Sequence, residues 1–208
     1  MRAIAIFLIT TFVWLFSLSH SAAKSSGLAG YKFRIAVHGG YSLQEFGGVV
    51  GANRSQINRF QYGVGAFYKS SWWENGLAFS AIPGVKVDPF VFRNGTQGQY
   101  QMDFTRFEFV TGVVYSRFGL YALVGLETIG WSGSPDLGAK NDPHLYFGAE
   151  ARMNFYFFGP TSRFSAPLSI RYLSHPNRNI EFERNPDENI TVSPGAETAF
   201  NMGVAVAF

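Results

Sequence analysis

The chain has 208 residues, of which 47% are hydrophobic and only 15% are charged, with a net charge of +3, 22 phenylalanines, 23 glycines and no cysteine. Soluble domains average about 25% charged residues and disordered chains hold few aromatic residues, so the composition is typical of neither and favours β structure with tight turns. The lack of cysteine excludes disulfides and thiolate metal sites, and the scattered Lys and Arg exclude a nucleic-acid surface.

The first 23 residues have the organisation of a secretory signal peptide. Arg2 supplies the positive residue, residues 3–18 are apolar and uncharged, and Ser21-Ala22-Ala23 has the small residues of a cleavage site. We therefore predict cleavage after Ala23 and a single domain over residues 24–208. An uncleaved membrane anchor is the alternative, although residues 3–18 are short for a helical span.

The rest of the chain contains eight segments with period-2 alternation, which predicts eight strands. One face of each segment carries large apolar side chains, whereas the other carries glycine, alanine and isolated charges. We expect a bulge where Pro83-Gly84 interrupts the third segment. In chain order the apolar faces lie in residues 31–37, 60–68, 77–87, 107–115, 120–126, 145–157, 166–172 and 200–208.

The chemistry of the two faces decides the class of β protein. A soluble sandwich would turn its apolar face inward and present a solvated face rich in Lys, Glu, Asp and Thr. Here the second face is small with isolated charges, which suits a narrow lumen, and the apolar face suits lipid. The sequence therefore predicts an all-β fold, an eight-stranded antiparallel up-and-down transmembrane β-barrel, with a soluble lipocalin-like carrier as the competing fold.

The connections alternate in length in the way that is typical of outer-membrane barrels. Those after the first, third, fifth and seventh strands are long, and the other three are short. We expect the long ones to face outward and both termini to lie on the opposite side. The long connections cover residues 42–56, 88–99, 132–143 and 176–195.

The last eight residues carry a family resemblance. Asn201, Gly203, Val206 and Phe208 fit the pattern that outer-membrane barrels present to the barrel-assembly machinery. The chain from residue 24 onward resembles the small eight-stranded barrels typified by the membrane domain of OmpA and by OmpX. This resemblance implies a monomer in the outer membrane of a Gram-negative bacterium, with both termini periplasmic. It also implies contact with outer-membrane lipid and lipopolysaccharide, with no cofactor and no nucleic-acid partner.

The charged residues of the inner face are expected to fill the lumen. An eight-stranded barrel is just wide enough for side chains, so a diffusion pore is not expected. Because an unpaired buried charge is costly, we expect a mutually paired ion network. The set comprises Lys32, Arg34, Arg59, Arg106, Glu108, Glu127, Glu150, Arg152, Arg171 and Glu197. We expect Glu108, Glu127 and Glu150 to pair with Arg106, Arg152 and Arg171.

A filled lumen favours a structural or surface-interaction role carried by the long loops. A small gated channel or transport barrel that uses the same charged residues is one alternative. The histidines His38, His144 and His175 are separated along the chain, so no metal site is predicted.

An enzyme is the other alternative. Residues 171–177 and 185–189 are similar to a late strand and loop of the PagL-type lipid A deacylases, outer-membrane esterases with a Ser-His-Glu arrangement. The residues available for that chemistry are Ser174, His175 and Glu188. However, Asn177 stands where the nucleophile belongs, and adjacent residues of a strand point to opposite faces. We therefore assign no catalytic residues, and a deacylase-like esterase that uses Ser174, His175 and Glu188 stays an alternative to the non-enzymatic role.

Overall fold

The computed structural model describes residues 32–47, 57–91, 97–134, 136, 138, 142–159, 162–176, 180–181 and 191–208. The expected signal peptide lies outside these residues. No helix in this part of the chain combines the length and apolar character of a transmembrane helix. The strands are β1 (Phe33–Gly47), β2 (Ile57–Ser70), β3 (Trp73–Val91), β4 (Gln97–Tyr115), β5 (Phe118–Ser134), β6 (His144–Tyr156), β7 (Phe164–Ser174), β8 (Ile180–Glu181) and β9 (Thr191–Ala207).

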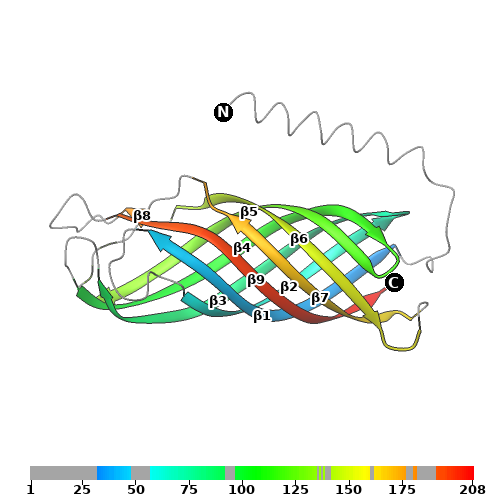
Figure 1. Cartoon of the computed structure of the whole chain (residues 1–208), viewed down its shortest axis with the longest axis horizontal. Helices are drawn as coiled ribbons and strands as arrows, with labels where there is room; N and C mark the ends of the chain where they lie inside the picture. Colours follow the sequence, from blue (N-terminus) through cyan, green and yellow to red (C-terminus); the bar gives the residue numbers. More distant parts are fainter. Residues whose placement is uncertain are drawn as a thin grey trace, which may run out of the picture.

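Eight of these strands close a barrel. Strands β1 to β6 each pair with the strand that follows in the chain, β7 pairs with β9, and β9 returns to β1, every pair being antiparallel. The two-residue β8 pairs only with the start of β9. The structure therefore confirms the predicted eight-stranded all-β barrel, whose strands run obliquely around a common axis (Figure 1).

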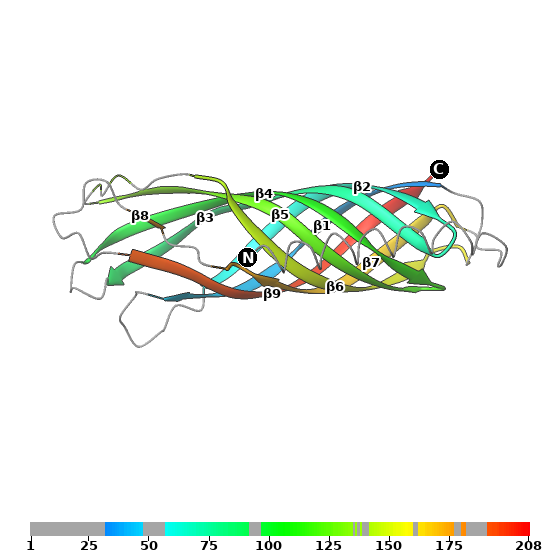
Figure 2. The ribbon, with the colours of Figure 1, turned by 90° about the horizontal axis from the view of Figure 1, so that it is seen from above.

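The two ends of the barrel differ. Phe208 and the start of β1 lie at one end, which we call the terminus end, and β8 lies at the other, which we call the loop end (Figures 1 and 2). At the terminus end, residues 71–72 join β2 to β3 and residues 116–117 join β4 to β5. Ser71 has a φ of 57° and Ser116 a φ of 54°. Left-handed residues are typical of two-residue hairpin turns, because their backbone twist matches that of the strands.

Side chains alternate strictly between the outside and the lumen. In β4, Phe107 is 53% exposed on the outer face, whereas its neighbours Arg106 and Glu108 are buried inside. The same alternation runs through β5, where Leu120 is exposed and Tyr121 is buried. Charged side chains inside and apolar ones outside are the reverse of what a soluble lipocalin-like carrier would show.

The strands are longer than the alternation predicted. The segment 42–56 was expected to be a connection, but β1 continues to Gly47, and β4 and β9 likewise begin inside predicted connections. The reason is that backbone pairing needs no apolar side chain, so the ladder continues past the apolar band. The expected bulge is present, because the β3–β4 register shifts between Ile82 and Val85, around Pro83.

Candidate functional site

The lumen holds the main concentration of chemically active side chains in the described structure. Five arginines and five glutamates point inward, nearly all fully buried, and their formal charges cancel. The set is Arg34, Arg59, Arg106, Arg152, Arg171, Glu74, Glu108, Glu127, Glu150 and Glu197. Glu74 was absent from the predicted set because the alternation of its strand was recognised only from Leu77 onward. Lys32, which was in that set, is exposed at the terminus end.

One cluster lies toward the loop end and is centred on Glu197. The carboxylate of Glu197 accepts hydrogen bonds from Arg59 Nη2 at 2.7 Å and from Arg106 Nη1 at 2.9 Å. Arg106 Nε also donates to Glu127, its direct cross-strand neighbour on β5. The guanidinium of Arg59 stacks on the Phe104 ring, with Cζ 4.2 Å from the ring centroid. This loop-end cluster therefore joins side chains from β2, β4, β5 and β9.

A second cluster lies toward the terminus end and centres on Glu150. This carboxylate accepts from Arg152 Nε at 2.6 Å and from Arg171 Nε at 2.8 Å. Arg171 continues across the lumen to Glu108, with Nη1 2.9 Å from Oε2. Arg152 continues in the other direction to Glu74, with Nη1 3.1 Å from Oε1.

Two tyrosines and a further arginine complete the terminus-end cluster. Tyr121 donates its hydroxyl to Glu74 at 2.9 Å, and Glu74 also pairs with Arg34. Tyr146 donates to Glu108 at 2.6 Å, while its ring lies under Arg106, 5.6 Å from Cζ. Tyr146 therefore lies between the two clusters. Every glutamate of the set contacts at least one arginine, as burial of a charge requires.

A small cavity within the terminus-end cluster shows how closely this part of the lumen is filled. Its volume is about 20 Å³, and its lining includes His38, Arg171 and Asn201. That volume has room for about one water molecule. Two polar atoms that make no hydrogen bond to protein, His38 Nε2 and Asn201 Nδ2, belong to lining residues. At this level the lumen is packed with side chains.

His175 joins the loop-end cluster. Its Nδ1 lies 3.8 Å from Glu127 Oε1, and its Nε2 lies 3.9 Å from Glu197 Oε2. One ligating atom from each of these three residues can be chosen so that all lie within 4.8 Å of one another, a spacing that a metal ion could bridge. The predicted set did not include this group, because the spacing of the histidines along the chain does not reveal which carboxylates they face across the lumen.

The charges around Glu127, His175 and Glu197 indicate that these residues belong to the ion network and do not form a metal site. The two imidazole nitrogens face different carboxylates, so they do not converge on one point. Both carboxylates are already neutralised by Arg59 and Arg106. A divalent cation would add two uncompensated charges to a buried cluster that is neutral, which is strongly unfavourable.

The PagL resemblance receives no support from the structure. Ser174 is exposed on the outer face of β7, whereas His175 is buried in the lumen. The imidazole therefore cannot take a proton from the Ser174 hydroxyl. Asn177 and Glu188 lie outside the described residues.

The predicted assembly pattern lies on β9, the strand that closes the barrel against β1. Asn201 is buried and accepts a hydrogen bond from Gln61 Nε2 at 2.6 Å. Gly203 stands opposite His38 and Val206 opposite Ile35, while Phe208 is exposed at the terminus end. The pattern thus alternates between the lumen and the outer face.

Comparisons with known proteins identify the fold. No protein-family model and no curated protein matches the chain. Among solved structures, Neisserial surface protein A is 12% identical with a TM-score of 0.51, covering 85% of this chain and 97% of its own. The outer membrane protein OprG of Pseudomonas aeruginosa is 10% identical with a TM-score of 0.51, covering 88% and 99%.

A third similar structure is Ail, the attachment invasion locus protein of Yersinia pestis. It is 12% identical with a TM-score of 0.50, and the match covers 85% of this chain and 99% of Ail. Likeness at such low identity concerns the backbone and carries no activity from one protein to another. The chain therefore has the fold of the small eight-stranded outer-membrane β-barrels.

Proposed function

We propose that this protein is an integral outer-membrane barrel with a closed lumen and a structural or surface-interaction role carried by its loop end. The observation that carries the proposal is the neutral Arg–Glu network, which fills the inside of a barrel whose outside is apolar. A charged interior with this degree of pairing serves as a plug, because separating any pair would leave buried charges without partners. The proposal assigns no catalytic step to the protein.

The outer surface supports placement in a membrane. Large apolar side chains are exposed on all eight barrel strands, including Val37, Val64, Leu77, Phe107, Leu126, Leu145, Ile170 and Val204. Soluble monomers rarely expose contiguous apolar patches beyond a few hundred Å². Contact with lipid tails removes this cost, which favours a transmembrane position.

The difference between the two ends supports an orientation. Short turns are typical of the periplasmic side of outer-membrane barrels, and longer connections of the outer side. We therefore place the terminus end in the periplasm and the loop end outside, in contact with lipopolysaccharide. The proposal includes export by a signal peptide over residues 1–23, a single domain over residues 24–208, and a monomeric state. Recognition by the assembly machinery would use Asn201, Gly203, Val206 and Phe208.

Ion conductance tests the closed lumen. Two ion pairs, Arg106 to Glu197 and Arg171 to Glu108, run from one wall of the lumen to another. An ion could pass only by separating them, so we expect no conductance steps from the folded protein in planar lipid bilayers. Removal of both crossing pairs in a neutral variant that combines Arg106→Ser, Glu197→Ser, Arg171→Ser and Glu108→Ser should produce conductance.

The preparation must be folded for this comparison to hold. Heat-modifiable migration in detergent gels shows folding of the wild type and of the variant. The matched control is Asp103→Ser, which alters an exposed residue of the outer face of β4 and should stay closed. Regular conductance steps from the wild type would contradict the plug and favour a gated channel.

A further inference from the structure

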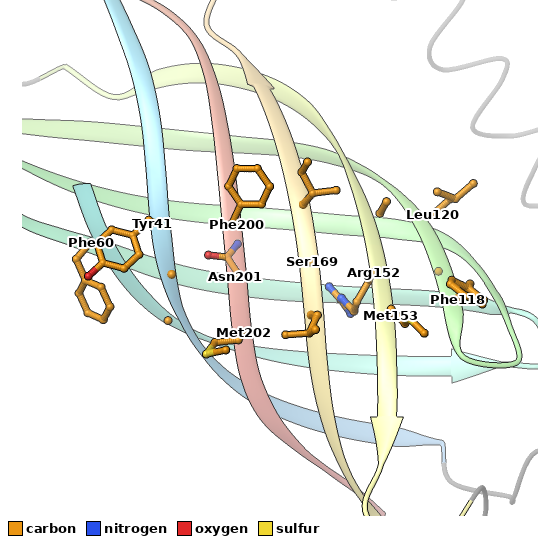
Figure 3. A pocket seen from close by; sticks show the side chains of 16 residues that line it. Tyr41, Phe60, Phe118, Leu120, Arg152, Met153, Ser169, Phe200, Asn201 and Met202 are labelled. Atoms are coloured by element: carbon orange, nitrogen blue, oxygen red, sulfur yellow. The ribbon is translucent and has the colours of Figure 1, made fainter. Parts of the chain in front are cut away.

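A groove crosses the outer face of the barrel from β5 to β2 (Figure 3). Its volume is about 880 Å³. The outward-facing residues Gly39 and Ala151 are small and leave room for it between larger neighbours. The walls are apolar and include Phe118, Leu120, Leu168, Ile170, Phe200 and Met202. A groove of this kind on a lipid-facing wall fits hydrocarbon chains.

Strand register brings one end of the groove to the terminus end. Phe118 of β5 pairs with Met153 of β6, Met153 pairs with Leu168 of β7, and Leu168 pairs with Met202 of β9. These four side chains form a row across neighbouring strands, and Figure 3 shows Phe118, Met153 and Met202 on this wall. Phe118 begins β5, so the row starts beside the turn between β4 and β5.

Two arginines lie at the terminus end of strands that carry the groove. Arg117 precedes Phe118 in the β4–β5 turn, and Arg163 precedes Phe164 at the start of β7; both are exposed. Exposed aromatic residues accompany them, with Tyr115 84% and Phe158 82% exposed. Aromatic and basic side chains together are typical of the level at which lipid headgroups lie.

The sign of the charge at the terminus end is uniform. Outside the lumen network, the charged side chains described at this end are Lys32, Lys69, Arg117 and Arg163. No Asp or Glu of the described residues lies there outside that network. Toward the loop end, by contrast, the exposed charged side chains described are Asp103, Asp136 and Asp142. The terminus end is therefore complementary to anionic headgroups.

We infer that this groove is a binding site for an anionic phospholipid of the periplasmic leaflet. The acyl chains lie in the groove along the row from Phe118 to Met202, and the phosphate lies between Arg117 and Arg163. Guanidinium groups suit a phosphate because they offer several donors in a planar fork. The inference rests on the proposed periplasmic position of the terminus end.

Native mass spectrometry of the folded, detergent-purified protein tests the site. The protein is mixed with equal amounts of phosphatidylglycerol and phosphatidylcholine that carry the same acyl chains. We expect preferential retention of phosphatidylglycerol, on the order of tenfold, since two basic residues face its headgroup. The double variant Arg117→Gln with Arg163→Gln should bind both lipids equally, whereas Lys69→Gln, near the terminus end of β2 and across the barrel from β6, should keep the preference.

Filling the groove provides a second and independent variant. Ala151→Trp should remove most of the bound phosphatidylglycerol, because its ring occupies the path of the acyl chains. Ala149→Trp is the matched control, since Ala149 lies two residues away on the same exposed face of β6 but does not line the groove. It should bind lipid as the wild type does.

The results of these lipid-binding experiments test the groove and not the proposed function of the barrel. Equal retention of the two lipids by the wild type, or unchanged binding in Ala151→Trp, would overturn the inference. Heat-modifiable migration and membrane fractionation test the barrel and its placement separately. A folded barrel in the outer-membrane fraction without lipid preference would leave the proposed function standing and remove only this site.

Discussion

At the scale of single residues, Glu150 shows how the lumen accommodates buried charge. Its carboxylate lies between Arg152, two residues along the same face of β6, and Arg171, directly opposite on β7. Both contacts follow from strand geometry, since alternate residues share a face and paired residues are adjacent. The two arginines also reach Glu74 and Glu108, so Glu150 is the centre of a five-residue chain of ion pairs.

Removal of this one charge should destabilise the barrel. Glu150→Gln keeps the shape of the side chain but leaves two buried guanidinium groups with a single carboxylate partner each. Breaking buried pairs in this way typically costs about 3–5 kcal/mol. We expect a loss of that size in the free energy of unfolding, measured by urea titration of the protein in phospholipid vesicles.

The matched control makes the same chemical change on the outer face. Asp103→Asn lies on the exposed side of β4 and should change the unfolding free energy by less than about 0.5 kcal/mol. A Glu150→Gln variant as stable as this control would show that the ion network adds little to stability.

At the scale of elements, the hairpins of the terminus end combine a strict alternation with strained turns. The alternation predicted which residues share each face of a strand, because successive side chains of an extended backbone point to opposite faces. It underestimated strand length, since Gln97 to Gln101 of β4 pair without an apolar face. The turn at Ser116 needs a left-handed residue, which the alternation of neighbouring strands does not reveal.

The backbone at Ser116 makes a prediction about the β4–β5 turn. A β-branched residue is disfavoured at positive φ, and the left-handed conformation costs roughly 1–2 kcal/mol for residues with a Cβ. Ser116→Val should therefore lower the unfolding free energy by about 1 kcal/mol, whereas Ser116→Gly should not lower it. Urea unfolding of the two variants in the same vesicles provides the measurement. Equal stability of the valine and glycine variants would contradict the turn geometry.

At the scale of the whole molecule, an apolar outer wall and a neutral charged interior are two parts of one arrangement. The outer wall needs a membrane to avoid exposing its apolar surface, and the interior needs complete pairing because it is shielded from water. The loop end and the terminus end then differ in connection length and in the sign of their exposed charge. These differences between the two ends support the proposed orientation of the barrel across the membrane.

Tag accessibility on cells tests this direction. A peptide tag inserted within residues 135–143, between β5 and β6, should bind antibody on intact cells. A tag inserted after Ala23 should bind only after the outer membrane is permeabilised, because the proposed orientation places the terminus end in the periplasm. Both tagged proteins should fractionate with the outer membrane and show heat-modifiable migration. Labelling of the N-terminal tag on intact cells would reverse the proposed orientation.

The sequence by itself determined the class of fold and the side of the wall on which most residues lie. Alternation along each strand is local, so it could be recognised in Phe107 and its neighbours without knowledge of any other strand. Only the tertiary structure decided which charges meet. Arg106 and Glu197 are 91 residues apart and touch because closure and stagger bring β4 opposite β9.

The same reason explains what sequence analysis missed. Glu74 joined the network through partners on β1, β5 and β6, and His175 met Glu127 and Glu197 across the lumen. The lipid groove likewise exists only because closure places β9 between β7 and β1. Period 2 specifies a direction for each side chain, whereas contacts between strands depend on how the sheet closes on itself.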